Sequence, residues 1–126
     1  MQVISMFNIN YLFVLTSVVI IACGQIIFKY AAKELHIDPT QAYVAILRAN
    51  VYPFGLVTIA LALYLISTVA WVQALRTVPL SIAFMFNSIA FILVPIASSL
   101  LFHEPISRHF ILGMALIIGG IILISR

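Results

Sequence analysis

The chain has 126 residues, of which 65% are hydrophobic and 7% are charged, and its net charge is +3. Because a soluble globular domain carries about 25% charged residues, this composition excludes a water-soluble enzyme or a soluble nucleic-acid-binding domain. The mean hydropathy of +1.27 instead indicates a small polytopic membrane protein whose solvent is the bilayer.

Four apolar segments are expected to cross the membrane. A spanning helix needs roughly 20 mostly apolar residues, and such windows lie near residues 11–30, 55–75, 81–102 and 110–124. Together they use most of the chain. The expected fold class is therefore an all-α membrane protein, a four-transmembrane-helix bundle in which residues 1–126 form a single domain.

The loop after the first span has a helical pattern of its own. In HIDPTQAYVAILRAN, Asp38 has the character of an N-cap and Pro39 suits the first helical position. Tyr43, Ile46 and Leu47 then recur at helical spacing. The sequence thus predicts a short amphipathic interfacial helix that lies in the headgroup region.

The other two connections are short. Pro79 opens a turn between spans two and three, so these spans are expected to form an antiparallel hairpin. Between spans three and four, in FHEPISRH, Pro105 is expected to end one helix and Ser107 to cap the next.

Basic side chains lie at the ends of the spans and indicate the orientation in the membrane. With four spans, loops one and three share one side, which carries Lys29, Lys33, Arg48 and Arg108. The other side carries Arg76 and Arg126. The positive-inside rule favours a cytoplasmic location for loops one and three. If Lys29 lies too deep to count, the margin is three against two, so dual orientation stays open.

Lys29 is the first charged side chain and stands near the end of the first span. A lysine at the bilayer centre costs about 2.5–3.5 kcal/mol on insertion scales, and intramembrane ionisable groups commonly mark functional sites. Gln25 lies one turn earlier on the same face, and Gly24 allows a neighbour to approach closely. Two interpretations have equal weight: a snorkelling lysine with a glutamine bonded to another helix, or an anion-binding site in a groove.

Loop three lies on the same side of the membrane as Lys29 and Lys33, and it contains Glu104 and Arg108. This arrangement allows an ion pair between Lys29 and Glu104. It also allows a cationic rim of Lys29, Lys33 and Arg108 that faces an anionic headgroup. The position of Glu104 near the start of span four is explained equally well by the helix dipole, which favours a carboxylate there.

Other polar and small residues occur inside the spans. Asn87 in span three and Tyr64 in span two need hydrogen-bond partners, and bonding between helices is favoured over the lining of a polar path. Gly113 and Gly120 lie seven residues apart on one face of span four. This spacing predicts a close-packing seam, for which a partner subunit is favoured over another helix of the same chain.

The histidines His36, His103 and His109 lack the pair spacing of a metal site. Neither a nucleophile with a neighbouring base nor a phosphate-binding glycine loop is found. The sequence therefore gives no argument for an enzyme, a metal or a cofactor.

Four motifs, in this order, resemble the EamA-type drug/metabolite transporter superfamily. They are GQIIFKYA (Gly24–Ala31), the segment Ala62–Phe84, HEPIS (His103–Ser107) and GMALIIGGIIL (Gly113–Leu123). Together they extend over nearly the whole chain, and the four-span length is similar to that of the small single-repeat members.

Two small branches of that superfamily compete. The small multidrug resistance proteins need a membrane carboxylate three residues before the glycine that Gly24 resembles, and this chain has Ile21 there. The flippase subunits that move aminoarabinose-phosphoundecaprenol are the closer resemblance. The GQ…K of span one, the VP…IA that enters span three and HEPISRH carry it.

The resemblance implies a subunit of a flippase for a polyisoprenyl-phosphate-linked sugar in the bacterial inner membrane. Its expected substrate-binding residues are Lys29, Gln25, Glu104, Lys33, Arg108, Asn87 and Tyr64. The expected partners are the lipid-linked sugar phosphate, membrane lipids, and a second copy or a sister subunit that packs on Gly113 and Gly120. No cofactor, metal or nucleic acid is expected. The alternatives are a small-solute or cationic-drug exporter and a non-transporting scaffold subunit of a membrane glycosyltransferase.

Overall fold

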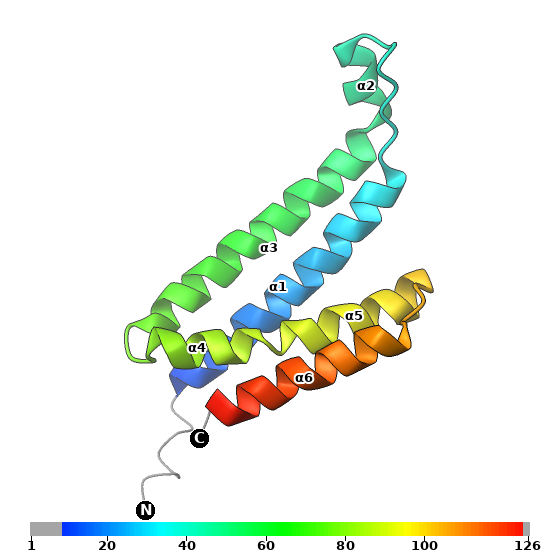
Figure 1. Ribbon diagram of the computed structural model, residues 1–126. Helices are drawn as coiled ribbons and strands as arrows, with labels where there is room; N and C mark the ends of the chain where they lie inside the picture. The colour runs from blue at the N-terminus through cyan, green and yellow to red at the C-terminus, as the bar shows by residue number, and fades with distance from the viewer. Residues whose placement is uncertain (1–8, 125–126) are drawn as a thin grey trace, which may run out of the picture.

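Six helices form the part of the protein that the computed structural model describes, residues 9–124 (Figure 1). In chain order they are α1 (Ile9–Glu34), α2 (Tyr43–Ala49), α3 (Val51–Leu75), α4 (Leu80–Asn87), α5 (Ala90–Phe102) and α6 (Arg108–Ile124). Residues 9–124 contain no strand, so the expected all-α class is confirmed. Arg126, which entered the orientation argument, lies outside the described residues.

Three segments are long and apolar enough to cross a membrane: Ile9–Glu34, Val51–Leu75 and Leu80–Phe102. They coincide with the first three predicted spans. The apolar helix α6 has 17 residues, fewer than the roughly 20 that a straight crossing needs. The fourth crossing therefore stays a prediction.

Helices α1 and α3 run antiparallel and pack along most of their length (Figure 1). Small residues allow this close approach, and Ser17 and Ser67 lie fully buried between the two helices. The two hydroxyl oxygens are 2.7 Å apart, and each also lies about 3 Å from the other residue's carbonyl oxygen. Because lipid supplies no hydrophobic drive between helices, such packing and hydrogen bonding hold the pair together.

The third predicted span, residues 81–102, is not one continuous helix, because it is interrupted at Ser88 and Ile89 between α4 and α5 (Figure 1). The backbone hydrogen bonds here join residues three apart, where an α-helix joins residues four apart. One example is the bond from Ser88 N to Met85 O at 3.2 Å. The Ser88 hydroxyl also donates to the Met85 carbonyl. Pro95, inside α5, lacks an N–H for the helical ladder. Side-chain insertion into the ladder and proline are established causes of such bends.

The prediction that Asp38 caps the helix of the first loop is wrong. Helix α2 begins five residues later, at Tyr43, after Ala42 at the N-cap position. Asp38 instead accepts hydrogen bonds from the Thr40 backbone N (2.9 Å) and hydroxyl (2.7 Å). The aspartate thus closes a local turn, which competes with capping. The structure contains no membrane, so the interfacial location of α2 stays a prediction.

Asn50 joins the first loop to the start of α3. Its side chain is fully buried. The amide oxygen accepts from His36 N at 2.7 Å, while the amide nitrogen donates to the carbonyls of His36 (2.7 Å) and Ile46 (2.8 Å). One side chain therefore fixes the loop that follows α1 against the junction of α2 and α3.

The connection between α5 and α6 follows the sequence prediction. Helix α5 ends at Phe102, and the C-cap residue His103 that follows has a φ of 55°, in the left-handed region. The Ser107 hydroxyl then accepts from Phe110 N at 3.1 Å, so its predicted capping role is confirmed. After this turn α6 runs back beside α5 and α4 (Figure 1).

Replacement of Ser67 tests the α1–α3 contact. Ser67→Ala removes one interhelical hydrogen bond and should cost about 0.6 kcal/mol, the average for such bonds in membranes. Ser67→Leu must also separate the helices and should cost about 1–3 kcal/mol more. Thermal unfolding of the purified protein in detergent measures both. Thr58→Leu, at an exposed position of the same helix, is the control, and equal melting temperatures for the two leucine variants would contradict the contact.

Candidate functional site

A lysine, a glutamate and a serine meet at the loop end of α1. Lys29 Nζ lies 2.6 Å from Glu104 Oε1. The Ser98 hydroxyl of α5 donates to the other carboxylate oxygen, Oε2. The side chains of the ion pair are 46% and 43% exposed, so the pair lies at a boundary of the protein. Glu104 thereby ties α1 to α5.

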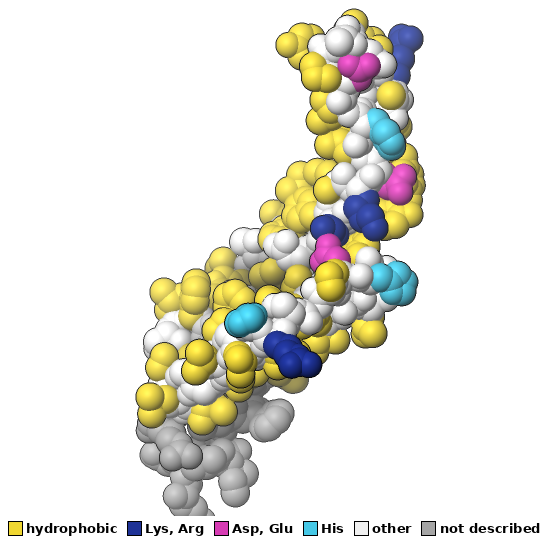
Figure 2. All heavy atoms as spheres, turned by 45° about the vertical axis from the view of Figure 1, so that its right-hand side comes forward, with side chains coloured by type: hydrophobic (Ala, Val, Ile, Leu, Met, Phe, Trp, Pro, Cys, Tyr) yellow, Lys and Arg dark blue, Asp and Glu magenta, His cyan; other side chains and the backbone are white. Residues whose placement is uncertain are grey.

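Lys33 adds a second cation one turn further along α1. Its Nζ lies 5.1 Å from the centre of the Phe102 ring, a cation–π contact. Arg108, by contrast, is exposed at the start of α6 and forms no ion pair with any residue in the range 9–124. The structure thus brings Lys29, Lys33 and Glu104 together, while Arg108 forms no ion pair with Glu104. Figure 2 shows basic and acidic side chains on one face, with hydrophobic surface on both sides.

The surroundings of Glu104 favour its ionised form. The hydrogen bond from Lys29 holds the pKa of this carboxyl below its usual value, and the bond from Ser98 lowers the pKa further. The charge of Lys33 acts in the same direction. At neutral pH the site therefore holds a carboxylate and an ammonium that neutralise each other.

Gln25 and Tyr64 form a second polar contact, one turn before Lys29. The Gln25 amide donates to the Tyr64 hydroxyl, which joins α1 to α3. Gly24 makes room for the tyrosine ring, because a Cβ at this position would lie 2.6 Å from Tyr64 Cε2. The predicted close approach at Gly24 is thus made by Tyr64 of the same chain.

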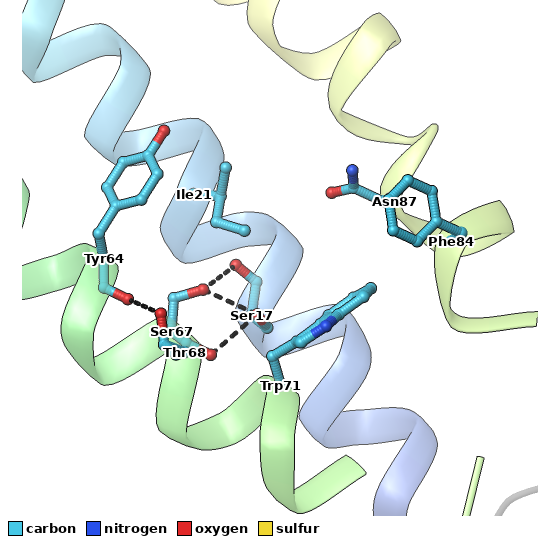
Figure 3. A pocket seen from close by; sticks show the side chains of 8 residues that line it. All are labelled: Ser17, Ile21, Tyr64, Ser67, Thr68, Trp71, Phe84 and Asn87. Carbon is cyan, nitrogen blue, oxygen red and sulfur yellow. Dashed lines mark hydrogen bonds between the residues drawn. The ribbon is translucent and has the colours of Figure 1, made fainter. Parts of the chain in front are cut away.

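Asn87 lies apart from the ion pair, beside a cavity of about 220 Å³ between α1, α3 and α4 (Figure 3). Tyr64 lines the same cavity and, through its hydroxyl, contacts Gln25. The predicted substrate-binding residues therefore lie in two places. Lys29, Lys33 and Glu104 lie at one end of α1, and Asn87 lies further along the helices. The contact between Gln25 and Tyr64 connects the two places.

Gly113 and Gly120 face open space. A Cβ built at either glycine would meet no atom within 4 Å in the described part of the chain. The predicted packing seam is therefore not used by the helices of this chain, and its use by a partner stays a prediction.

Sequence reasoning missed Ser98 and the hydrogen bonds by which the Asn50 side chain joins the first loop to the start of α3. Ser98 is the third member of the charged cluster, but its sequence position among apolar residues only indicates an ordinary spanning serine. Asn50 is the last residue of the segment whose pattern predicts the first-loop helix, and that pattern does not indicate a buried side chain. Its place directly before a long apolar segment is the sequence signal for a helix junction.

Together these features define a multi-pass helical membrane protein with a charged site between its helices. Small membrane transporters form such a class, and the chain belongs to the EamA-like transporter family, which it matches over residues 3–126. The resemblance seen in the sequence is thus confirmed. With three long apolar helices, the chain is a multi-pass protein of the bacterial inner membrane.

Relatives in two bacteria match most of the chain. One is the probable 4-amino-4-deoxy-L-arabinose-phosphoundecaprenol flippase subunit ArnE of Escherichia fergusonii, with 34% identity over 81% of this chain and 84% of that protein. The other is the corresponding probable subunit ArnF of Proteus mirabilis, with 30% identity over 93% of this chain and 92% of that protein. No solved structure matches the chain significantly.

The lowered pKa of Glu104 predicts how stability depends on pH. A depressed folded-state pKa stabilises the protein above the unfolded pKa, about 4.3 for glutamate, and this contribution is lost as the pH falls through the folded value. The melting temperature of the wild type should therefore exceed that of Glu104→Gln by a constant margin between about pH 7 and pH 5, and the margin should close only below about pH 4.

Glu34→Gln is the matched control, since the Glu34 carboxylate of α1 forms no ion pair within residues 9–124. Thermal unfolding in detergent at each pH gives the margin for both variants. A Glu104→Gln margin that disappears between about pH 7 and pH 5 would contradict the depressed pKa.

Proposed function

We propose that the chain is a subunit of a flippase that moves a polyisoprenyl-phosphate-linked sugar across the bacterial inner membrane. The family is one of transporters, and the two relatives are named as flippase subunits for such a lipid. The observation that carries the proposal is the Lys29 ammonium, which lies in the last turns of the long apolar helix α1 and is paired with the Glu104 carboxylate.

Exchange of one anion for another is the proposed binding step. The lipid phosphate displaces Glu104 and takes a charge-assisted hydrogen bond from Lys29. Because one anion replaces another, Lys29 is never left as an unpaired charge near the hydrocarbon, where its cost would be high. The released Glu104 carboxylate then binds an amino group on the sugar. A headgroup that carries both a phosphate and an amine therefore suits the two halves of the ion pair.

The other polar residues assist this exchange. Gln25, one turn from Lys29, hydrogen-bonds the phosphate or the sugar when it leaves the Tyr64 hydroxyl. Lys33 adds positive potential on the same side, and Arg108 attracts anionic headgroups from its exposed position without direct contact. The polyisoprenyl tail stays in the lipid.

The charge arrangement supports lipid export over the export of cationic drugs. A drug exporter of this fold needs a free carboxylate inside the span, and Ile21 occupies the position expected for it. Glu104, whose carboxylate contacts α1 and α5, is already neutralised by Lys29. A flippase also moves its substrate unchanged, so the proposal includes no reaction, metal or cofactor.

A second subunit completes the proposed path. The four predicted spans enclose little space for a headgroup, and α6 carries the open glycine face of Gly113 and Gly120. The two relatives are named as subunits ArnE and ArnF, which supports a sister chain as the partner. Close contact of helix backbones at these glycines is the proposed interface.

Lys29→Ala tests the anion site. A hydrogen bond to a charged group is worth about 1.5–3 kcal/mol, so loss of the ammonium should weaken phosphate-lipid binding about 10- to 100-fold and abolish flipping at limiting lipid. Lys29→Arg keeps the charge and should keep most of the activity. Translocation of a lipid-linked aminosugar in proteoliposomes that hold the chain and any partner is the measurement.

Arg76→Ala, at the other end of the helices, is the control for a general loss of positive charge. Both alanine variants should insert into the membrane. Lys29→Ala should melt below the wild type, as is expected of Glu104→Gln, because both lose the Lys29–Glu104 ion pair, while Arg76→Ala should melt like the wild type. Full translocation by the Lys29→Ala protein would remove the proposed role of Lys29 in phosphate binding.

Gly113→Leu tests the interface. The leucine meets no atom of the described chain, so the fold should be kept, while a partner helix on this face would be pushed away. Crosslinking or native mass spectrometry in detergent should show loss of the dimer or of the complex with the sister subunit. Gly55→Leu, at an equally open glycine of α3, should leave the assembly unchanged, and an intact assembly in Gly113→Leu would exclude this interface.

A further inference from the structure

The cavity beside Asn87 lies between three helices, α1, α3 and α4. It is lined by Ser17 and Ile21 of α1, by Tyr64, Ser67, Thr68 and Trp71 of α3, and by Phe84 and Asn87 of α4 (Figure 3). Its volume is about 220 Å³. Drug-sized ligands occupy pockets of roughly 300–1,000 Å³, so this cavity suits a group smaller than these.

Several polar groups at the cavity keep hydrogen-bonding capacity that the contacts within residues 9–124 do not use. The amide of Asn87 points toward the cavity (Figure 3), and neither it nor the indole N–H of Trp71 has a hydrogen-bond partner among residues 9–124. The Tyr64 hydroxyl accepts from Gln25 and retains its own hydrogen to donate. Thr68 Oγ1 donates to the Tyr64 carbonyl and can still accept. Polar groups at membrane depth are costly without partners, which points to a polar occupant.

The walls between these polar groups are aromatic. The rings of Trp71 and Phe84 meet edge to face, with centroids 6.2 Å apart and an interplanar angle of 77°. Aromatic rings pack against the C–H groups on the face of a saturated sugar ring, while amide and hydroxyl side chains hydrogen-bond the hydroxyl groups at its edge. The lining contains no ionisable carboxylate, ammonium or guanidinium, so neither a free cation nor a phosphate finds a counter-charge here.

We infer that this cavity binds the pyranose ring of a sugar, with the ring against Trp71 and Phe84 and its hydroxyls on Asn87 and Thr68. The inference rests on the proposed function and assigns a second place to the same substrate. Tyr64 lines the cavity and contacts Gln25, which lies one turn from Lys29. A sugar that follows its phosphate past this contact therefore enters the cavity from the ion-pair end.

Fluorescence of Trp71 reads the cavity directly, because it is the single tryptophan of the chain. The purified full chain in nanodiscs is titrated with methyl arabinopyranoside, a neutral sugar ring without phosphate or amine, and separately with inorganic phosphate. The glycoside should shift the Trp71 emission saturably, and phosphate should not. Asn87→Ala should weaken the glycoside response about tenfold and Thr68→Val about threefold, as expected for the loss of one or two hydrogen bonds.

Thr58→Val is the matched control for Thr68→Val. Both threonines are exposed residues of α3, and each donates its hydroxyl to the carbonyl four residues earlier, but Thr58 lies outside the cavity. An unchanged response in Thr58→Val, with weaker responses in the two cavity variants, supports the sugar site. Absence of a saturable response in the wild type, or equal responses in the two valine variants, overturns it.

The titration measures sugar binding without transport, so its result can overturn the cavity site while the flippase proposal stands, or support it while that proposal fails. A saturable glycoside response that depends on Thr68 supports the cavity site even if Lys29→Ala flips lipid normally. Loss of flipping in Lys29→Ala with no Trp71 response keeps the flippase and overturns the cavity site. An equal response to inorganic phosphate also overturns it, because the cavity has no cation to bind that anion.

Discussion

The arrangement of the helices depends on the need to neutralise one ammonium. Lys29 lies in the last turns of the apolar helix α1. Its charge is costly there unless an anion of the same molecule or a bound anionic ligand neutralises it. Glu104 meets this need, and Ser98 holds the carboxylate in place. The contact fixes α5 and its following loop against α1. The same requirement makes the pair responsive to any competing anion.

Polarity along α1 changes in steps that match the environments around it. Ser17 is deep between helices and is paired with Ser67, Gln25 contacts Tyr64, and Lys29 lies at the boundary. The side chains become more polar toward the end of the helix, from hydroxyl to amide to ammonium, because a polar group is better solvated there. The charged site and the aromatic cavity are therefore neighbours along one helix, with the Gln25–Tyr64 contact between them.

Hydrophobic run lengths predicted the all-α class and four spans, because a bilayer imposes a minimum length on any crossing helix. The first three coincide with long apolar helices, and the fourth stays a prediction. The Lys29–Glu104 pairing was foreseen as one of two options, since topology put both residues on one side. The break at Ser88 and the turn at Asp38 were not foreseen, because both result from local side-chain hydrogen bonds that compete with the regular helical ones. The position of Arg108 away from the ion pair depends on packing that composition cannot reveal.

The interruption between α4 and α5 has a mechanical consequence. At Ser88 the backbone hydrogen bonds join residues three apart, and Pro95 has no N–H to donate to the helical ladder. The third span is therefore easier to bend than an unbroken helix. The bend separates α5, which bears Ser98 and leads to Glu104, from α4, which bears Phe84 and Asn87. The anchor of the ion pair and the aromatic cavity therefore lie on opposite sides of the most pliable point of the third span, and are not held by one rigid helix.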